Sequence, residues 1–163
     1  MHKDNIMLLK DCQMEDFVNY KEASMFLIFP FCSFKCDKEL GCDLCQNSPL
    51  TKFPNKDIDI QKLIERYLDN PITHAVVCGG LEPLDSWNDL LDFITQFRRY
   101  TEDTIVIYTG FYKEEKEKEV KELQKFKNII IKFGRYIPNQ QKHYDKVLGV
   151  YLASDNQYAE KIS

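Results

Sequence analysis

The stretch "HAVVCGGLEP" at residues 74–83 joins a continuous apolar run to a pair of glycines. Hydrophobicity without alternation is typical of a strand that is buried on both faces of a parallel sheet. Similar runs lie at residues 25–31, 104–110 and 128–134, and the latter two also end in glycine. Glycine lets the backbone bend sharply or admit a ligand. The four runs therefore predict four buried strands, three of which end in a turn that a ligand can approach.

Helical patterns separate these runs. Apolar residues recur at spacings of three and four within 57–68 and within 86–100, which predicts two amphipathic helices. The sequence "SWND" has the form of a capping box, with Ser86 as the N-cap and Asp89 as its return partner. The charged segment 112–127 keeps one apolar edge and is predicted to be a helix with a solvated face.

Alternating strands and helices predict an α/β fold with a mainly parallel sheet built from right-handed crossover units. A further strand at 147–153 would bring the sheet to five or six strands, in a single domain that spans residues 1–163. A closed eight-stranded barrel typically needs about 250 residues. A partial open barrel or a small doubly wound sheet remains, and in both folds ligands gather at the carboxyl ends of the strands.

Composition narrows the class of function. Hydrophobic residues make up 44% and charged residues 29% of the chain, as in a soluble globular protein. The net charge of −4 argues against a nucleic-acid partner, because nucleic-acid-binding faces are basic. No apolar run approaches the roughly 20 residues that cross a bilayer, and the charged N-terminus does not resemble a signal peptide. We therefore expect a cytoplasmic protein without membrane contact, with reduced thiols.

Four cysteines crowd into "CSFKCDKELGCDLCQN" at residues 32–47, directly after the first apolar run. They are Cys32, Cys36, Cys42 and Cys45. In a reducing compartment such a cluster favours metal binding over disulfides. A structural zinc site commonly joins two cysteine pairs that are about a dozen or more residues apart, and here the two pairs are separated by only five residues. An iron–sulfur cubane accepts such closely spaced thiolates. Four thiolate ligands would make an electron-transfer centre, and three would leave one iron open to a ligand. The spacing does not decide between these alternatives.

The motifs together resemble a known family. "CSFKC…CQN" after the first strand, "GGLEP" after the second and "YTG" after the third are similar to radical S-adenosylmethionine proteins. More narrowly, they resemble the activating protein of anaerobic ribonucleoside-triphosphate reductase. "FGRY" and "SDNQ" are similar to its late motifs. The resemblance implies a partial open barrel of the radical S-adenosylmethionine type that carries one [4Fe–4S] cluster.

The resemblance also implies a ligand set. The family's usual spacing is C-x3-C-x2-C, whereas here a longer insertion follows Cys36. "CQN" resembles the family's third cysteine with its polar pair, so Cys32, Cys36 and Cys45 are the predicted ligands. Cys42 is then a spare thiol, and the rival set of Cys36, Cys42 and Cys45 stays open.

The glycine turn is where the resemblance places S-adenosylmethionine. Backbone groups of Gly79 and Gly80 would approach its amino group, and Glu82 would offset the ammonium charge. Leu81 departs from the family's pattern, in which the acid follows the two glycines directly.

Later motifs are predicted to complete the cofactor site. Thr109 and Gly110 would touch the cofactor, and Arg135 would meet a carboxylate. Asn156 and Gln157 belong to a late motif whose role the sequence does not specify. No catalytic residue is predicted beyond the cluster ligands.

The implied function is that of an enzyme, a radical S-adenosylmethionine oxidoreductase. Its reduced cluster would cleave S-adenosylmethionine to a 5′-deoxyadenosyl radical, which abstracts hydrogen from a glycine of the reductase's large glycyl-radical subunit. An external donor such as flavodoxin or ferredoxin would supply the electron. The alternatives are a radical enzyme acting on a small molecule or a tRNA nucleobase, an electron-transfer protein, and a zinc module.

Overall fold

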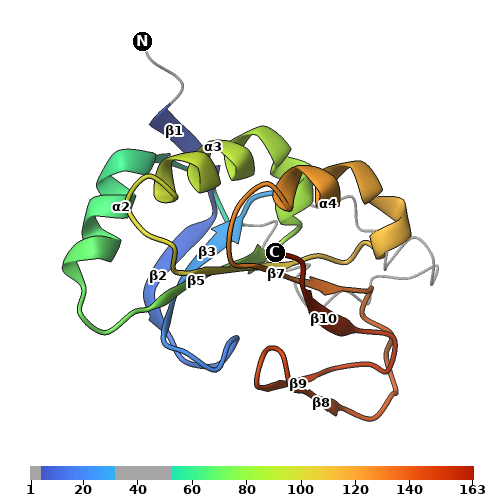
Figure 1. Ribbon diagram of the computed structural model, residues 1–163. Helices are drawn as coiled ribbons and strands as arrows, with labels where there is room; N and C mark the ends of the chain where they lie inside the picture. The colour runs from blue at the N-terminus through green and yellow to red at the C-terminus, as the bar shows by residue number, and fades with distance from the viewer. Residues whose placement is uncertain (1–4, 32–52) are drawn as a thin grey trace.

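A six-stranded mixed sheet forms the centre of the computed structural model, which describes residues 5–31 and 53–163 (Figure 1). Its strand order is β10-β7-β6-β5-β3-β2. The strands are β2 (Asp11–Asp16), β3 (Ser24–Phe29), β5 (Ala75–Gly80), β6 (Thr104–Tyr108), β7 (Ile129–Phe133) and β10 (Tyr158–Lys161). The four central strands are parallel, and β2 and β10 pair antiparallel at the two edges. The predicted α/β fold with a mainly parallel sheet is confirmed.

Helices cover one face of this sheet (Figure 1). They are α2 (Ile60–Asp69), α3 (Trp87–Phe97) and α4 (Glu117–Leu123), and the short 3-10 turns η3 (Pro83–Ser86) and η4 (Lys113–Glu115) precede the last two. A doubly wound sheet carries helices on both faces. The sequence left a partial open barrel and a doubly wound sheet as alternatives. Helices on one face only are consistent with the first, a partial radical S-adenosylmethionine barrel.

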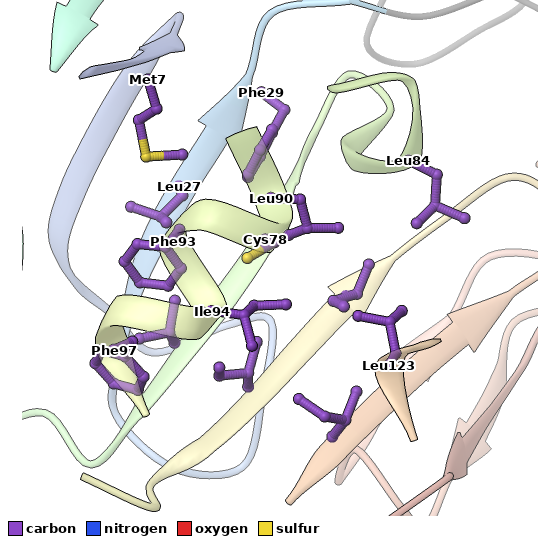
Figure 2. Packing of buried hydrophobic residues seen from close by; sticks show 14 of the residues in the cluster. Met7, Leu27, Phe29, Cys78, Leu84, Leu90, Phe93, Ile94, Phe97 and Leu123 are labelled. Atoms are coloured by element: carbon purple, nitrogen blue, oxygen red, sulfur yellow. The ribbon is translucent and has the colours of Figure 1, made fainter. Parts of the chain in front are cut away.

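The larger core lies between the helices and the sheet. Figure 2 shows Leu90, Phe93 and Phe97 of α3 packed over Leu27 of β3 and Cys78 of β5. All five side chains are fully buried. Burial of a large apolar side chain contributes about 1.5–3 kcal/mol, so this layer anchors the parallel strands. Cys78 is thus a small buried residue of this core.

The opposite face of the sheet is covered by a short antiparallel pair, β8 (His143–Asp145) and β9 (Val150–Leu152), below the sheet in Figure 1. A smaller apolar cluster fills the space between them, and Val77, Ile130 and Leu152 contribute to it. The strand predicted at 147–153 is therefore shorter than expected and pairs with β8 instead of the central sheet. The last strand of that sheet is β10.

A second small sheet pairs β1 (Ile6–Leu9) with β4 (Lys56–Asp59). The helix predicted from residue 57 therefore begins later, at Ile60, because residues 57–59 belong to β4. The side chain of Asp59 caps α2 by accepting a hydrogen bond from the backbone N–H of Lys62 at 3.1 Å. The N-cap satisfies a helix donor that would otherwise be unpaired.

Two further local predictions are wrong. The predicted capping box at α3 does not form: among the described residues the Ser86 hydroxyl has no hydrogen-bond partner. The Asp89 carboxylate instead accepts from the backbone N–H of Leu8 in β1 at 3.1 Å. The helix predicted over 112–127 is divided, with η4 before α4 and an end at Leu123.

Within the described residues, no helix is both long and apolar enough to cross a membrane.

Candidate cofactor cavity

A cavity of about 500 Å³ opens at the carboxyl ends of the central strands. Its walls include Phe26 and Ile28 of β3, whose side chains alternate with the buried residues of the helix-covered face. The cavity therefore lies on the sheet face that the helices do not cover. Five of the six predicted cofactor-binding residues line it together: Gly79, Gly80, Glu82, Thr109 and Gly110.

The predicted cluster ligands Cys32, Cys36, Cys45 and the alternative Cys42 lie outside the described residues. Among residues 5–31 and 53–163, no group of three or more histidine, cysteine or acidic side chains could hold a metal ion. The backbone N–H of Glu82 donates to the carbonyl oxygen of Phe31 at 2.6 Å, and Phe31 directly precedes Cys32. Phe31, the last described residue before the cysteine segment, therefore lies beside the glycine turn.

Gly80 makes this turn possible because its φ is +85°, in a region that side chains disfavour. A Cβ built on Gly80 would lie 2.4 Å from Cγ2 of Ile28 and 3.0 Å from Cα of the same residue. β3 and β5 therefore approach each other at a point where only glycine fits. Leu81 follows as a buried residue of the cavity wall, and Glu82 then caps η3.

Glu82 is buried, with 5% of its surface exposed. One carboxylate oxygen accepts from the backbone N–H of Gly110 at 2.7 Å, and the other accepts from that of Leu84 at 3.0 Å. Burial raises the pKa of Glu82 to about 7, and hydrogen bonds from Gly110, Leu84 and the Thr109 hydroxyl oppose this shift. The carboxylate thus bridges the turns that follow β5 and β6.

Arg135 lies outside the cavity lining. Its guanidinium is buried, pairs with the Glu115 carboxylate at 2.6 Å and stacks over the ring of Tyr112 at 4.8 Å. The carboxylate that Arg135 contacts in this structure is therefore the chain's own, from η4.

The late motif shapes the end of β7. Gly134 has a φ of +107°, and a Cβ built there would lie 3.0 Å from the carbonyl oxygen of Asn156. The Asn156 amide donates to the carbonyl of Arg135 at 2.7 Å, and the Gln157 amide donates to that of Gly134 at 3.3 Å. Gln157 also lines the cavity. Asn156 and Gln157 therefore hold the backbone of Gly134 and Arg135 in place beside the cavity.

Lys132 and Tyr108 are among the cavity residues that the sequence analysis did not propose for the site. The Lys132 side chain is buried, donates to the carbonyl of Gly134 at 3.0 Å and lies 5.7 Å from the centre of the Tyr108 ring. The Tyr108 hydroxyl donates to the carbonyl of Asn19 at 2.5 Å. The signal for Lys132 was a lysine inside an apolar run, since a buried lysine requires polar partners.

The cavity fits an S-adenosylmethionine molecule in size and in chemistry. Small-molecule sites usually have about 300–1,000 Å³ of space and a few polar groups on apolar walls. Here an acidic side chain, Glu82, and a basic one, Lys132, complement the two charges of an amino-acid moiety. Phe26, Ile28 and Tyr108 supply apolar wall for a planar base.

The family comparison agrees with this geometry. The family model described as "4Fe-4S single cluster domain" matches residues 24–158, from the first residue of β3 to the first residue of β10. No curated protein matches the chain. The family's cofactors are a [4Fe–4S] cluster and, for its radical type, S-adenosylmethionine. The chain belongs to the 4Fe-4S single cluster domain family and has the fold of its radical S-adenosylmethionine type.

Proposed function

We propose that this protein is an activase that generates a glycyl radical on the large subunit of an anaerobic ribonucleoside-triphosphate reductase. The observation that carries the proposal is the cavity at the carboxyl ends of the central strands, where Gly79, Gly80 and Glu82 meet Thr109 and Gly110. When bound, the reduced cluster supplies the electron that cleaves S-adenosylmethionine and so provides a radical able to abstract hydrogen.

The chain's own residues bind and orient the cofactor. Gly79 and Gly80 line the cavity and carry no Cβ, so an ammonium group can come close to their backbone. Lys132 brings positive charge to the same cavity for a carboxylate. Thr109 and Gly110 line the same cavity. Cys32, Cys36 and Cys45 remain the proposed cluster ligands, which leaves one iron open.

The mouth of the cavity supports a macromolecular substrate. Val18 and Tyr151 line the cavity from the segment after β2 and from β9, and they are 73% and 67% exposed. Exposed apolar side chains that line one opening offer contact surface to another protein. A loop of the large subunit would reach the cofactor between them, while flavodoxin or ferredoxin delivers the electron elsewhere on the surface.

The test uses anaerobically reconstituted protein with S-adenosylmethionine, a reductant and a purified glycyl-radical reductase subunit. We expect 5′-deoxyadenosine to form and a glycyl-radical EPR doublet to appear on the subunit. Cleavage without the doublet would favour a radical enzyme with a small-molecule or tRNA substrate. A cluster whose spectrum ignores S-adenosylmethionine would contradict the proposal and favour electron transfer.

Cysteine variants test the ligand set in the same assay. We expect Cys32→Ala, Cys36→Ala and Cys45→Ala to lose cluster iron and cleavage, and Cys42→Ala to retain both. Retention in Cys32→Ala with loss in Cys42→Ala would identify the rival set. Metal analysis of each variant is the control, because stoichiometric zinc in wild-type protein would contradict the cluster itself.

A further inference from the structure

The Glu82 carboxylate already accepts hydrogen bonds from the protein itself, which a residue that only offset the charge of a bound ammonium group would not require. Its two carboxylate oxygens accept from the backbone N–H groups of Gly110 and Leu84, at 2.7 and 3.0 Å. The Thr109 hydroxyl donates to the same carboxylate. These donors come from the turn after β6 and from the start of η3, so one side chain joins two strand ends.

The backbone of Glu82 adds a third strand end. Its N–H donates to the carbonyl of Phe31 at 2.6 Å, two residues beyond the last residue of β3. Glu82 is thus the residue at which the ends of β3, β5 and β6 are held together. Phe31 is the last described residue before the cysteine segment.

The cavity side of the Gly110 turn has little packing. A Cβ built on Gly110 would have only one neighbour within 4 Å among the described residues, Oε1 of Glu82 at 3.7 Å. The turn therefore faces open cavity space, and the hydrogen bond from its N–H to Glu82 is what restrains it on that side.

We propose that Glu82 is a positioning residue, whose carboxylate holds the Thr109–Gly110 turn against the turn after β5 at the spacing that S-adenosylmethionine binding needs. This inference rests on the proposed function for its ligand. It replaces the expectation that Glu82 serves mainly to offset the ammonium charge.

Two variants separate geometry from charge. Glu82→Gln keeps the length of the side chain but offers one accepting oxygen, so one backbone N–H is left unpaired. Glu82→Asp keeps the charge but is shorter by one methylene and cannot span Gly110 and Leu84. Asp85→Asn, an exposed acid of the same turn, is the matched control for loss of one negative charge.

The measurements are S-adenosylmethionine affinity, from the change in the cluster's EPR spectrum, and deuterium uptake of residues 104–112, both at pH 8 on the full chain with its cluster. We expect both Glu82 variants to bind about tenfold more weakly and to exchange faster at 109–112, because each leaves a buried donor unpaired. Cluster iron should be unchanged, and Asp85→Asn should match wild type.

Three results would overturn the inference. Weak binding in Glu82→Gln with wild-type binding in Glu82→Asp would show that the charge acts directly on the cofactor. Faster exchange with unchanged affinity would leave Glu82 a purely structural role. Unchanged exchange in both variants would show that the hydrogen bonds do not restrain the turn. If Glu82→Gln does not fold, Glu82→Asp decides alone. Failure of wild-type protein to bind S-adenosylmethionine would count against the proposed function, while the exchange data still report on the restraint.

Discussion

Replacement of Gly80 by alanine tests the close approach of β3 and β5. The residue has a φ of +85°, and a new Cβ would lie 2.4 Å from Cγ2 and 3.0 Å from Cα of Ile28. The positive φ costs a residue with a Cβ about 1–2 kcal/mol. Overpacking in a well-packed region costs a further amount of about 1–3 kcal/mol. We therefore expect Gly80→Ala to lose about 2–5 kcal/mol of unfolding free energy.

The assay is equilibrium unfolding in guanidinium chloride, followed by fluorescence of Trp87, the chain's single tryptophan. Gly79→Ala is the matched control, because its Cβ would meet only the ring edge of Phe26 at 3.1 Å and side-chain atoms farther away, and its φ is not positive. We expect this control to lose less than about 1 kcal/mol, since a ring edge can shift.

A second background separates the two contributions to the loss. In an Ile28→Ala protein the Cγ2 clash is absent but the 3.0 Å approach to Cα of residue 28 remains, so Gly80→Ala should cost less than in the wild-type background and at least the conformational part, about 1–2 kcal/mol. A loss below about 0.5 kcal/mol for Gly80→Ala in the wild-type background would refute the reasoning. Losses that small are typical of surface substitutions and would mean that β3 and β5 leave room for a Cβ at residue 80.

Three further predictions concern titration and burial. Because burial raises the pKa of Glu82 from 4.5 to about 7, the folded state holds a proton that the unfolded chain releases between these values. Unfolding free energy should therefore fall by up to about 3 kcal/mol as the pH rises from 4.5 to 7, and Glu82→Gln should lack this part of the decline when the two proteins are unfolded in parallel. Arg135→Met should lose about 2–3 kcal/mol, less than for a fully buried pair, because Glu115 keeps 29% of its side chain in contact with water. Arg135→Lys should recover part of that loss, and equal losses in both variants would contradict the ion pair. Burial raises the pKa of the Cys78 thiol far above its usual value, so iodoacetamide should label Cys78 only after unfolding. Mass spectrometry of native and unfolded samples checks this, and rapid native labelling would contradict the packed core.

The order of the central elements was predictable because each buried strand is a continuous apolar run. The runs around residues 25–31, 74–80, 104–110 and 128–134 became β3, β5, β6 and β7. The edge strand β2, with the sequence "DCQMED", carries no such signal. It is held by hydrogen bonds to β3, and a polar strand of this kind exists only once a partner strand is in place.

The candidate site divides in the same way. The meeting of the glycine turn with Thr109 and Gly110 followed from the rule that parallel strands end at one rim. The partners of each side chain did not follow, since Asp89 joined β1 and Arg135 joined Glu115 across distances in sequence that no local pattern encodes.

The sequence by itself determined the parallel strands, the position of the candidate site at their carboxyl ends and the cysteine cluster. Apolar runs, turn glycines and cysteine spacing can each be recognised within a few consecutive residues. Only the tertiary structure decided that the helices cover one face, that Lys132 faces the cavity and that Glu82 bonds to Gly110. Those outcomes depend on contacts between segments that are distant along the chain, and such contacts are chosen by the packing of the whole sheet.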